Sequence, residues 1–149
     1  MNLRLDKVVR VVALGVKRVY SLVLTDEGLY LIQTGQVGAL KHYRLTEGRQ
    51  VPIDSSRTDS DRSAKELQAN EDRIATVPLD ELAKIKDNYL VRLEAIEDVE
   101  VRSNRREPEM WIGVTGSEHH LFFPLAAEEE VQAFQRALAS GLAYGEVIA

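Results

Sequence analysis

Few residues of this chain have the types and spacing needed for chemistry, and the pair His119 and His120 comes first. His42 is the only other histidine, and the chain has no cysteine. Disulfide bonds, thiolate catalysis and cysteine-ligated zinc are therefore excluded. Because neighbouring residues of a strand point to opposite faces, His119 and His120 cannot easily bind one metal ion together. We expect ordinary strand histidines, no metal site and no cofactor.

Other catalytic patterns are equally weak. The glycine-bearing segment 113–117 lacks the lysine of a phosphate-binding loop, and segment 35–38 leads into no clear helix. The chain has 24 carboxylates, yet no two are set apart as an acid and a base. No strained nucleophile turn is visible. The sequence therefore predicts a protein that is not an enzyme.

Two groups of basic side chains form a candidate site for an anion or an acidic partner. One group follows the first predicted hairpin and the other lies on a later strand and its turn. Together they are Lys41, Arg44, Arg49, Arg102, Arg105 and Arg106. The alternative is a solvated face, because exposed charges contribute little to stability.

The charge and hydropathy of the chain limit its partners. The 149 residues carry a net charge of −5, which argues against a nucleic-acid binder. Residues 1–49 hold eight basic and four acidic side chains, whereas the remainder holds eleven and twenty. The most apolar stretch, residues 8–24, is interrupted by Arg10, Lys17 and Arg18, so no membrane-spanning helix is expected. We expect a soluble cytoplasmic protein.

The elements that position these residues begin with strands. Residues 1–17 fit either a short helix or an irregular first strand. Residues 19–24 and 29–32 are rich in β-branched and aromatic side chains, and the turn between them contains Asp26 and Gly28. This pattern predicts a hairpin. A third strand is expected from Val37.

A polar block follows and predicts a helical insertion over residues 53–88. Its first part, residues 53–64, has the composition of a solvated loop. A helix is predicted over residues 63–73, with Ser63 and Glu66 as a capping box. Thr76 is the predicted N-cap of a second helical stretch that Pro78 opens.

Sheet character then returns, and a helix ends the chain. Strands are predicted over residues 89–93, 99–102, 111–115 and 119–123, with a helical turn over residues 94–97. The final helix has one apolar stripe, formed by Ala127, Val131, Phe134 and Leu138. Gly141 is expected just past its C-terminus.

Three segments together resemble a pleckstrin-homology-like (PH-like) domain, in the broad sense that includes bacterial PH-like and GRAM-type modules. Residues 24–31 resemble the first hairpin of GRAM-type domains, and residues 93–101 resemble the step into their central strands. Residues 121–138 resemble their last strand and capping helix. The likeness covers residues 19–35 and 89–140 and consists of hydrophobic patterns.

The resemblance implies an α+β, mainly β fold: an antiparallel sandwich or partial barrel capped by a C-terminal helix. Residues 1–149 would then form one domain, with the insertion at 53–88 and the capping helix at about 126–140. Phosphoinositide-binding members have basic residues across the first strand, first turn and second strand. Here the first turn holds Asp26 and Glu27, which would repel an anionic headgroup.

The expected role is therefore that of a non-catalytic binding or scaffolding module. The first hypothesis is interaction with a protein partner or with a second copy, because exposed sheet edges can form backbone hydrogen bonds. The second is weak peripheral binding to anionic lipid through a basic patch. No feature points to nucleic acid.

Overall fold

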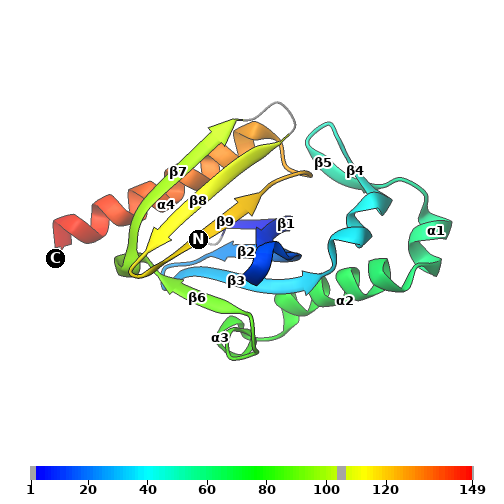
Figure 1. Ribbon diagram of the computed structural model, residues 1–149, viewed down its shortest axis with the longest axis horizontal. Coiled ribbons are helices and arrows are strands. Elements are labelled where there is room, and N and C mark those ends of the chain that lie inside the picture. The colour runs from blue at the N-terminus through cyan, green and yellow to red at the C-terminus, as the bar shows by residue number, and fades with distance from the viewer. Residues whose placement is uncertain (1–2, 104–106, 149) are drawn as a thin grey trace.

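The computed structural model describes residues 3–103 and 107–148, and its main element is a bent antiparallel sheet (Figure 1). The strands of this sheet are β1 (Leu3–Val11), β2 (Lys17–Leu24), β3 (Gly28–Gly35), β6 (Tyr89–Arg92), β7 (Ile96–Ser103), β8 (Pro108–Val114) and β9 (Ser117–Phe122). Their order across the seven-stranded sheet is β6-β3-β2-β1-β9-β8-β7. The fold is therefore α+β with a mainly antiparallel sheet.

The sheet bends around one core but does not close into a barrel. The strands at its two edges, β6 and β7, are joined along the chain by the short turn η3 (Leu93–Ala95). Val91 of β6 and Ile96 of β7 nevertheless belong to the same buried cluster. The hydrophobic effect therefore brings the edges towards one another without pairing them.

The C-terminal helix α4 (Glu128–Ile148) packs its apolar stripe into this core, behind β7 and β8 in Figure 1. Val131, Phe134 and Leu138 are buried, as the sequence predicts. Glu128 begins the helix, where the helix dipole favours negative charge. The predicted end at Gly141 is wrong, because the helix continues through this residue to Ile148.

β2 and β3 are buried on both faces, which explains their nearly unbroken apolar sequence. Leu22 and Leu31 face the main core. Val23 and Ile32 face the other side, where they pack against residues of the insertion. The hairpin predicted from residues 19–24 and 29–32 is confirmed.

The insertion between β3 and β6 covers this outer face of the sheet. It contains η2 (Val37–His42), β4 (Tyr43–Thr46), β5 (Arg49–Pro52), α1 (Ser55–Ser60), α2 (Arg62–Thr76) and α3 (Leu79–Ala83). Leu67 and Ile74 of α2 and Leu82 of α3 are buried against the sheet. The helical insertion predicted within residues 53–88 is confirmed and packs on the sheet, but the segment between β3 and β6 begins earlier and also contains η2, β4 and β5.

Several details of the insertion differ from the sequence predictions. Val37 begins a 3-10 helix, so the third strand starts later, at Tyr43. Part of the polar segment 53–64 forms α1, because the Asp54 carboxylate caps its N-terminus.

The N-caps of α2 and α3 also differ from the sequence predictions. Asp61, not Ser63, is the N-cap of α2 and accepts hydrogen bonds from the backbone N–H groups of Ser63 and Ala64. Thr76 is the last residue of α2 rather than the cap of the next helix, whose N-cap is Pro78. Aspartate and serine are about equally favourable N-caps, so the sequence alone does not decide between Asp61 and Ser63.

The first strand is irregular because it contains a β-bulge. Leu5 pairs with Leu22 but Val8 pairs with Tyr20, so β1 has one residue more than β2 between these pairs. Lys7 has a φ of 57°, in the left-handed region. Of the two alternatives for residues 1–17, the irregular strand is confirmed.

The bulge directs Lys7 out of the main core and towards α2. Its ammonium lies 3.0 Å from a carboxylate oxygen of Glu71 and 4.3 Å from the ring centre of Tyr43. Gln50 of β5 accepts a further hydrogen bond from it. Burial raises the pKa of Glu71, although the ammonium of Lys7 opposes this shift.

In the part of the chain that the structure describes, no helix is both long enough and apolar enough to cross a lipid bilayer.

Replacing Phe134 with alanine is expected to lower the free energy of unfolding by about 3–5 kcal/mol, because a cavity remains in the core. Chemical denaturation of the wild type and the variant measures this loss. Phe134 is only 2% exposed. An unchanged unfolding midpoint would contradict the packing of α4 described above.

Replacing Glu71 alone with leucine should lower the free energy of unfolding by about 3–5 kcal/mol, because the Lys7 ammonium stays buried without its partner. The double variant Lys7→Met, Glu71→Leu should lose much less, since no unpaired charge remains. Chemical denaturation of both variants tests this. Equal losses of unfolding free energy in the single and the double variant would show that the buried ion pair does not hold α2 against β1.

Candidate functional site

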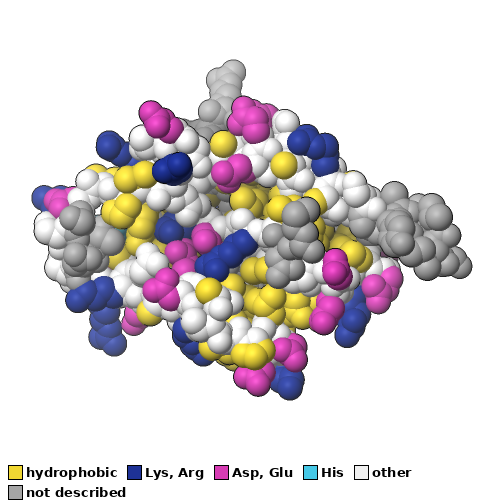
Figure 2. Space-filling model, turned by 180° about the vertical axis from the view of Figure 1, so that it is seen from behind, with side chains coloured by type: hydrophobic (Ala, Val, Ile, Leu, Met, Phe, Trp, Pro, Cys, Tyr) yellow, Lys and Arg dark blue, Asp and Glu magenta, His cyan; other side chains and the backbone are white. Residues whose placement is uncertain are grey.

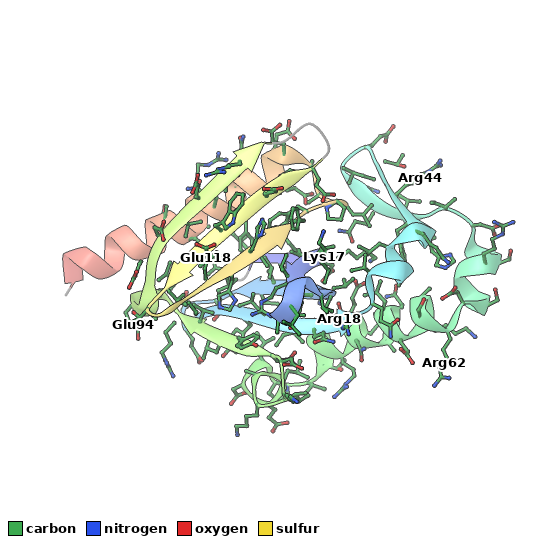
Figure 3. All side chains as sticks on the ribbon, viewed as in Figure 1. Lys17, Arg18, Arg44, Arg62, Glu94 and Glu118 are labelled. Atoms are coloured by element: carbon green, nitrogen blue, oxygen red, sulfur yellow. The ribbon has the colours of Figure 1, made fainter. Side chains whose placement is uncertain are left out.

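The bent sheet leaves a pocket of about 630 Å³ beside the loop between β1 and β2. Its lining includes polar side chains from β1, β2, β3, β6 and β9 and from the segment that precedes β6. These polar lining residues are Arg10, Arg18, Gln33, Asp87, Tyr89 and Glu118. Figure 3 labels Arg18 and Glu118 on the strands that border this pocket.

Arg10 lines the pocket and is buried, with 8% of its surface exposed. Its Nε donates a hydrogen bond to Nδ1 of His119 over 3.2 Å, and its Nη1 donates to the Tyr20 hydroxyl over 3.3 Å. The guanidinium also lies over the ring of Tyr89, 4.6 Å from its centre. No carboxylate of the described residues forms an ion pair with it.

The partners of Arg10 are neutral, so they do not cancel its charge. Burial, helped by the nearby guanidinium, lowers the pKa of His119 to about 4, which leaves the imidazole uncharged at neutral pH. Burial raises the pKa of Tyr20, which stays a phenol and donates to the Asp87 backbone carbonyl over 2.7 Å. A buried charge without a counter-charge is costly.

Arg18 adds a second positive charge at the same place. It is the cross-strand partner of Arg10 in the β1–β2 ladder, and both side chains line the pocket. Like charges directly opposite one another destabilise a strand pair. Asp87 and Glu118 are exposed residues that also line the pocket, and neither forms a described ion pair with the two arginines. Arg10 and Arg18 are thus two cross-strand cations that line one pocket together with the exposed carboxylates of Asp87 and Glu118.

The pocket carries several groups that can form hydrogen bonds with a ligand. A guanidinium has five N–H donors, and the hydrogen bonds of Arg10 to His119 and Tyr20 use two of them. The neighbouring Gln33 and Tyr89 are neutral hydrogen-bonding side chains. Over the described ranges, no three His, Asp or Glu side chains gather closely enough to hold a metal ion.

The two neighbouring histidines point to opposite faces, as their positions in a strand predict. His119 faces inwards to Arg10 and Tyr89. His120 faces outwards and stacks on Trp111, with ring centres 4.4 Å apart. Of the two, His119 alone contacts Arg10, which lines the pocket.

The basic residues singled out in the sequence lie elsewhere, in two separate parts of the fold. Lys41 is on η2, while Arg44 and Arg49 are on the small β4–β5 sheet. Arg102, on the edge strand β7, forms an ion pair with Glu100 and lies 4.7 Å from the ring centre of Trp111.

No described hydrogen bond or ion pair joins the two groups of basic residues. Arg105 and Arg106 lie outside the described residues. A role for these side chains as a patch for anions or partners stays a prediction.

Sequence reasoning missed Arg10 and Arg18 because it placed the first turn one strand too late. The acidic turn with Asp26 and Glu27 joins β2 to β3, whereas the first turn joins β1 to β2. That turn follows Arg10 and precedes Lys17 and Arg18. The available signal was the arginines that interrupt the most apolar stretch of the chain.

The low pKa of His119 predicts a pH-dependent stability. The unfolded chain binds a proton on this imidazole near pH 6.5, whereas the folded chain does so only near pH 4. The free energy of unfolding should therefore fall as the pH drops through this window, by up to about 1.4 kcal/mol per unit. Above pH 6.5 the contribution is constant.

The variant His119→Gln should lack this part of the pH dependence. Denaturant titrations at pH 7 and pH 5 on both proteins measure it. Parallel losses of stability in the two proteins would show that His119 is not held neutral by its surroundings.

Comparison of the chain with protein-family models finds no match, and comparison with curated proteins finds none either. The candidate site therefore rests on its own geometry. Its defining feature is the buried guanidinium of Arg10, which has no carboxylate partner among the described residues and whose cross-strand neighbour is a second arginine.

Proposed function

We propose that this chain is a non-catalytic, PH-like binding module that holds a phosphate-type anion between Arg10 and Arg18. The bent antiparallel sheet and its C-terminal helix support the PH-like assignment. The pocket beside the β1–β2 loop supports the binding role.

The observation that carries the proposal is the buried guanidinium of Arg10, whose described hydrogen-bond partners, His119 and Tyr20, are both neutral. Burying a charge is unfavourable unless an opposite charge or strong hydrogen bonds compensate it. A bound anion supplies both. It also relieves the repulsion between Arg10 and Arg18 across the β1–β2 ladder.

The planar guanidinium favours oxygen anions of tetrahedral or planar shape. It presents its N–H groups as a fork that matches two oxygens of a phosphate or carboxylate. Asp87 and Glu118 of the same pocket are acceptors, so they would bind hydroxyl or ammonium groups of the ligand. The best-fitting class is a phosphate ester whose alcohol part carries such donors.

Binding of a protein partner, or of a second copy, is the other candidate function. The observation that favours it is the open sheet, because β6 and β7 are edge strands. Edge strands can pair with another chain. Charged side chains on β7 disfavour such pairing, and they include Glu97, Glu100 and Arg102. The pocket therefore supports anion binding more strongly than the edges support protein binding.

Calorimetric titration with inorganic phosphate at constant ionic strength tests the proposed function. We expect saturable binding to the wild type and a loss of about tenfold to hundredfold in affinity for Arg18→Gln, because one charged hydrogen-bond partner is removed. Arg62→Gln is the matched control, since Arg62 is an exposed arginine on α2, away from the pocket.

The control also separates specific binding from general charge attraction. Equal weakening by Arg18→Gln and Arg62→Gln would mean that the anion responds only to net charge. Titration of all three proteins at two salt concentrations completes the test, because salt screens the non-specific attraction between the anion and the protein's exposed charges. Absence of saturable binding to the wild type would contradict the proposal.

A further inference from the structure

The insertion and the main sheet enclose a second cleft, of about 370 Å³, which the proposed function does not use. Strand β3 continues to Gly35, but its pairing with β6 ends at Leu31. Helix α2 runs alongside the end of β3, as Figure 1 shows, and lines the cleft together with the segment between α3 and β6. The cleft therefore lies beside a length of β3 that β6 does not cover, and its volume is within the usual range of ligand pockets.

Amide side chains tie the walls of the cleft to the end of β3. Oδ1 of Asn88 accepts a hydrogen bond from the backbone N–H of Gln33 over 2.8 Å, and its Nδ2 donates to the carbonyl of Leu82 over 2.9 Å. On α2, Nδ2 of Asn70 donates to the carbonyl of Thr34 over 2.8 Å. A cleft that is already held open in this way requires little further ordering when a ligand binds.

Charged side chains of both signs line this cleft. They are Arg73 and Glu66 of α2 and, from the segment before β6, Lys86 and Asp87. In the part of the chain that the structure describes, Glu66 forms an ion pair only with Arg62, over 3.5 Å, and the other three form none. The side chain of Arg62 is 94% exposed, so this pair is weak. The cleft thus offers both positive and negative partners to a ligand.

The charges on α2 are separated along the helix. Glu66, Asn70 and Arg73 lie at positions i, i+4 and i+7, so they share one face, and all three line the cleft. At a rise of about 1.5 Å per residue, Glu66 and Arg73 are about 10 Å apart along the axis. Three residues of an extended peptide span about the same length, at about 3.3 Å each. Asn70 lies between the two charges, where its carboxamide can bind a peptide backbone.

The cleft also has an apolar part. Ile85 is 47% exposed and lines the cleft, as do the buried side chains of Ile32 and Leu82. Small-molecule pockets commonly combine such apolar surface with a few polar groups that fix the orientation of the ligand. An apolar side chain in the middle of the ligand would therefore be favourable here.

We propose that this cleft binds a short peptide with free termini, about three residues long and with an apolar central side chain. The ammonium of its N-terminus pairs with Glu66, and the carboxylate of its C-terminus pairs with Arg73. The central side chain contacts Ile85. The inference does not rest on the proposed function, although the cleft adjoins the Arg10 pocket through Gln33 and Asp87, which line both.

A ligand with opposite charges at its two ends fits the cleft better than a single anion does. An anion bound by Arg73 and Lys86 would be repelled by the carboxylates of Glu66 and Asp87, which line the same cleft. Figure 2 shows acidic and basic side chains interspersed over the face seen from behind as well. Charge of one sign therefore does not by itself mark a ligand site on that face.

Calorimetric titration with the tripeptide alanyl-leucyl-alanine tests the inference on the full chain. We expect saturable binding to the wild type. Acetylation of the N-terminus or amidation of the C-terminus should each weaken the affinity at least about tenfold, because each removes one charged hydrogen-bond partner. Equal affinities for the free, acetylated and amidated peptides, or no saturable binding of the free peptide, would overturn the inference.

Two variants assign the ends of the peptide. Arg73→Gln should bind the free peptide at least about tenfold more weakly and should no longer distinguish it from the amidated form. Glu66→Gln should in the same way cease to distinguish the free from the acetylated peptide. Lys65→Gln and Glu81→Gln are the matched controls, because these exposed charges on α2 and α3 do not line the cleft. Losses of the same size in the controls would overturn the assignment.

Inorganic phosphate separates this inference from the proposed function. Arg73→Gln should bind phosphate as the wild type does, because Arg73 does not line the Arg10 pocket. Phosphate binding without tripeptide binding by the wild type would overturn the peptide site and leave the proposed function intact. Tripeptide binding that depends on Glu66 and Arg73, without phosphate binding, would support the peptide site and overturn the proposed function.

Discussion

The β-bulge at Lys7 is the local feature on which the rest of the structure depends. Side chains of a strand alternate between its two faces, so one extra residue reverses every later position. Leu5 precedes the bulge and Val8 follows it, yet both face the main core. The same reversal brings Arg10 into the pocket and directs Lys7 towards α2. Without it, Arg10 would face outwards and Lys7 inwards.

This arrangement buries two positive charges, and only one of them has a carboxylate partner among the described residues. Lys7 is neutralised by Glu71 of α2, which fastens the insertion to the sheet. Arg10 has only neutral hydrogen-bond partners in the described structure, and Arg18 adds further repulsion. Of these two buried charges, the one without a described carboxylate partner is the group to which the proposed function assigns an anion. The buried ion pair joins α2 to β1, whereas the Arg10 guanidinium, whose described partners are neutral, marks the candidate site.

The elements with strong periodicity could be predicted from sequence, and those set by long-range contacts could not. The apolar stripe that includes Phe134 predicts α4, and the hairpin around Gly28 predicts β2 and β3. The bulge at Lys7 has no local signal, because its partner Glu71 is far along the chain. The site was missed for the same reason: Arg10 enters the pocket only because the bulge precedes it.

The central claim is that the guanidinium groups of Arg10 and Arg18 bind one anion together. The most direct measurement is a ¹H–¹⁵N spectrum of the arginine Nε–H groups during titration with inorganic phosphate at constant ionic strength. The account predicts that the Arg10 and Arg18 signals shift together and saturate, while the signal of Arg62 stays in place. Signals of all three arginines that shift alike, or an Arg10 signal that does not respond, would contradict it.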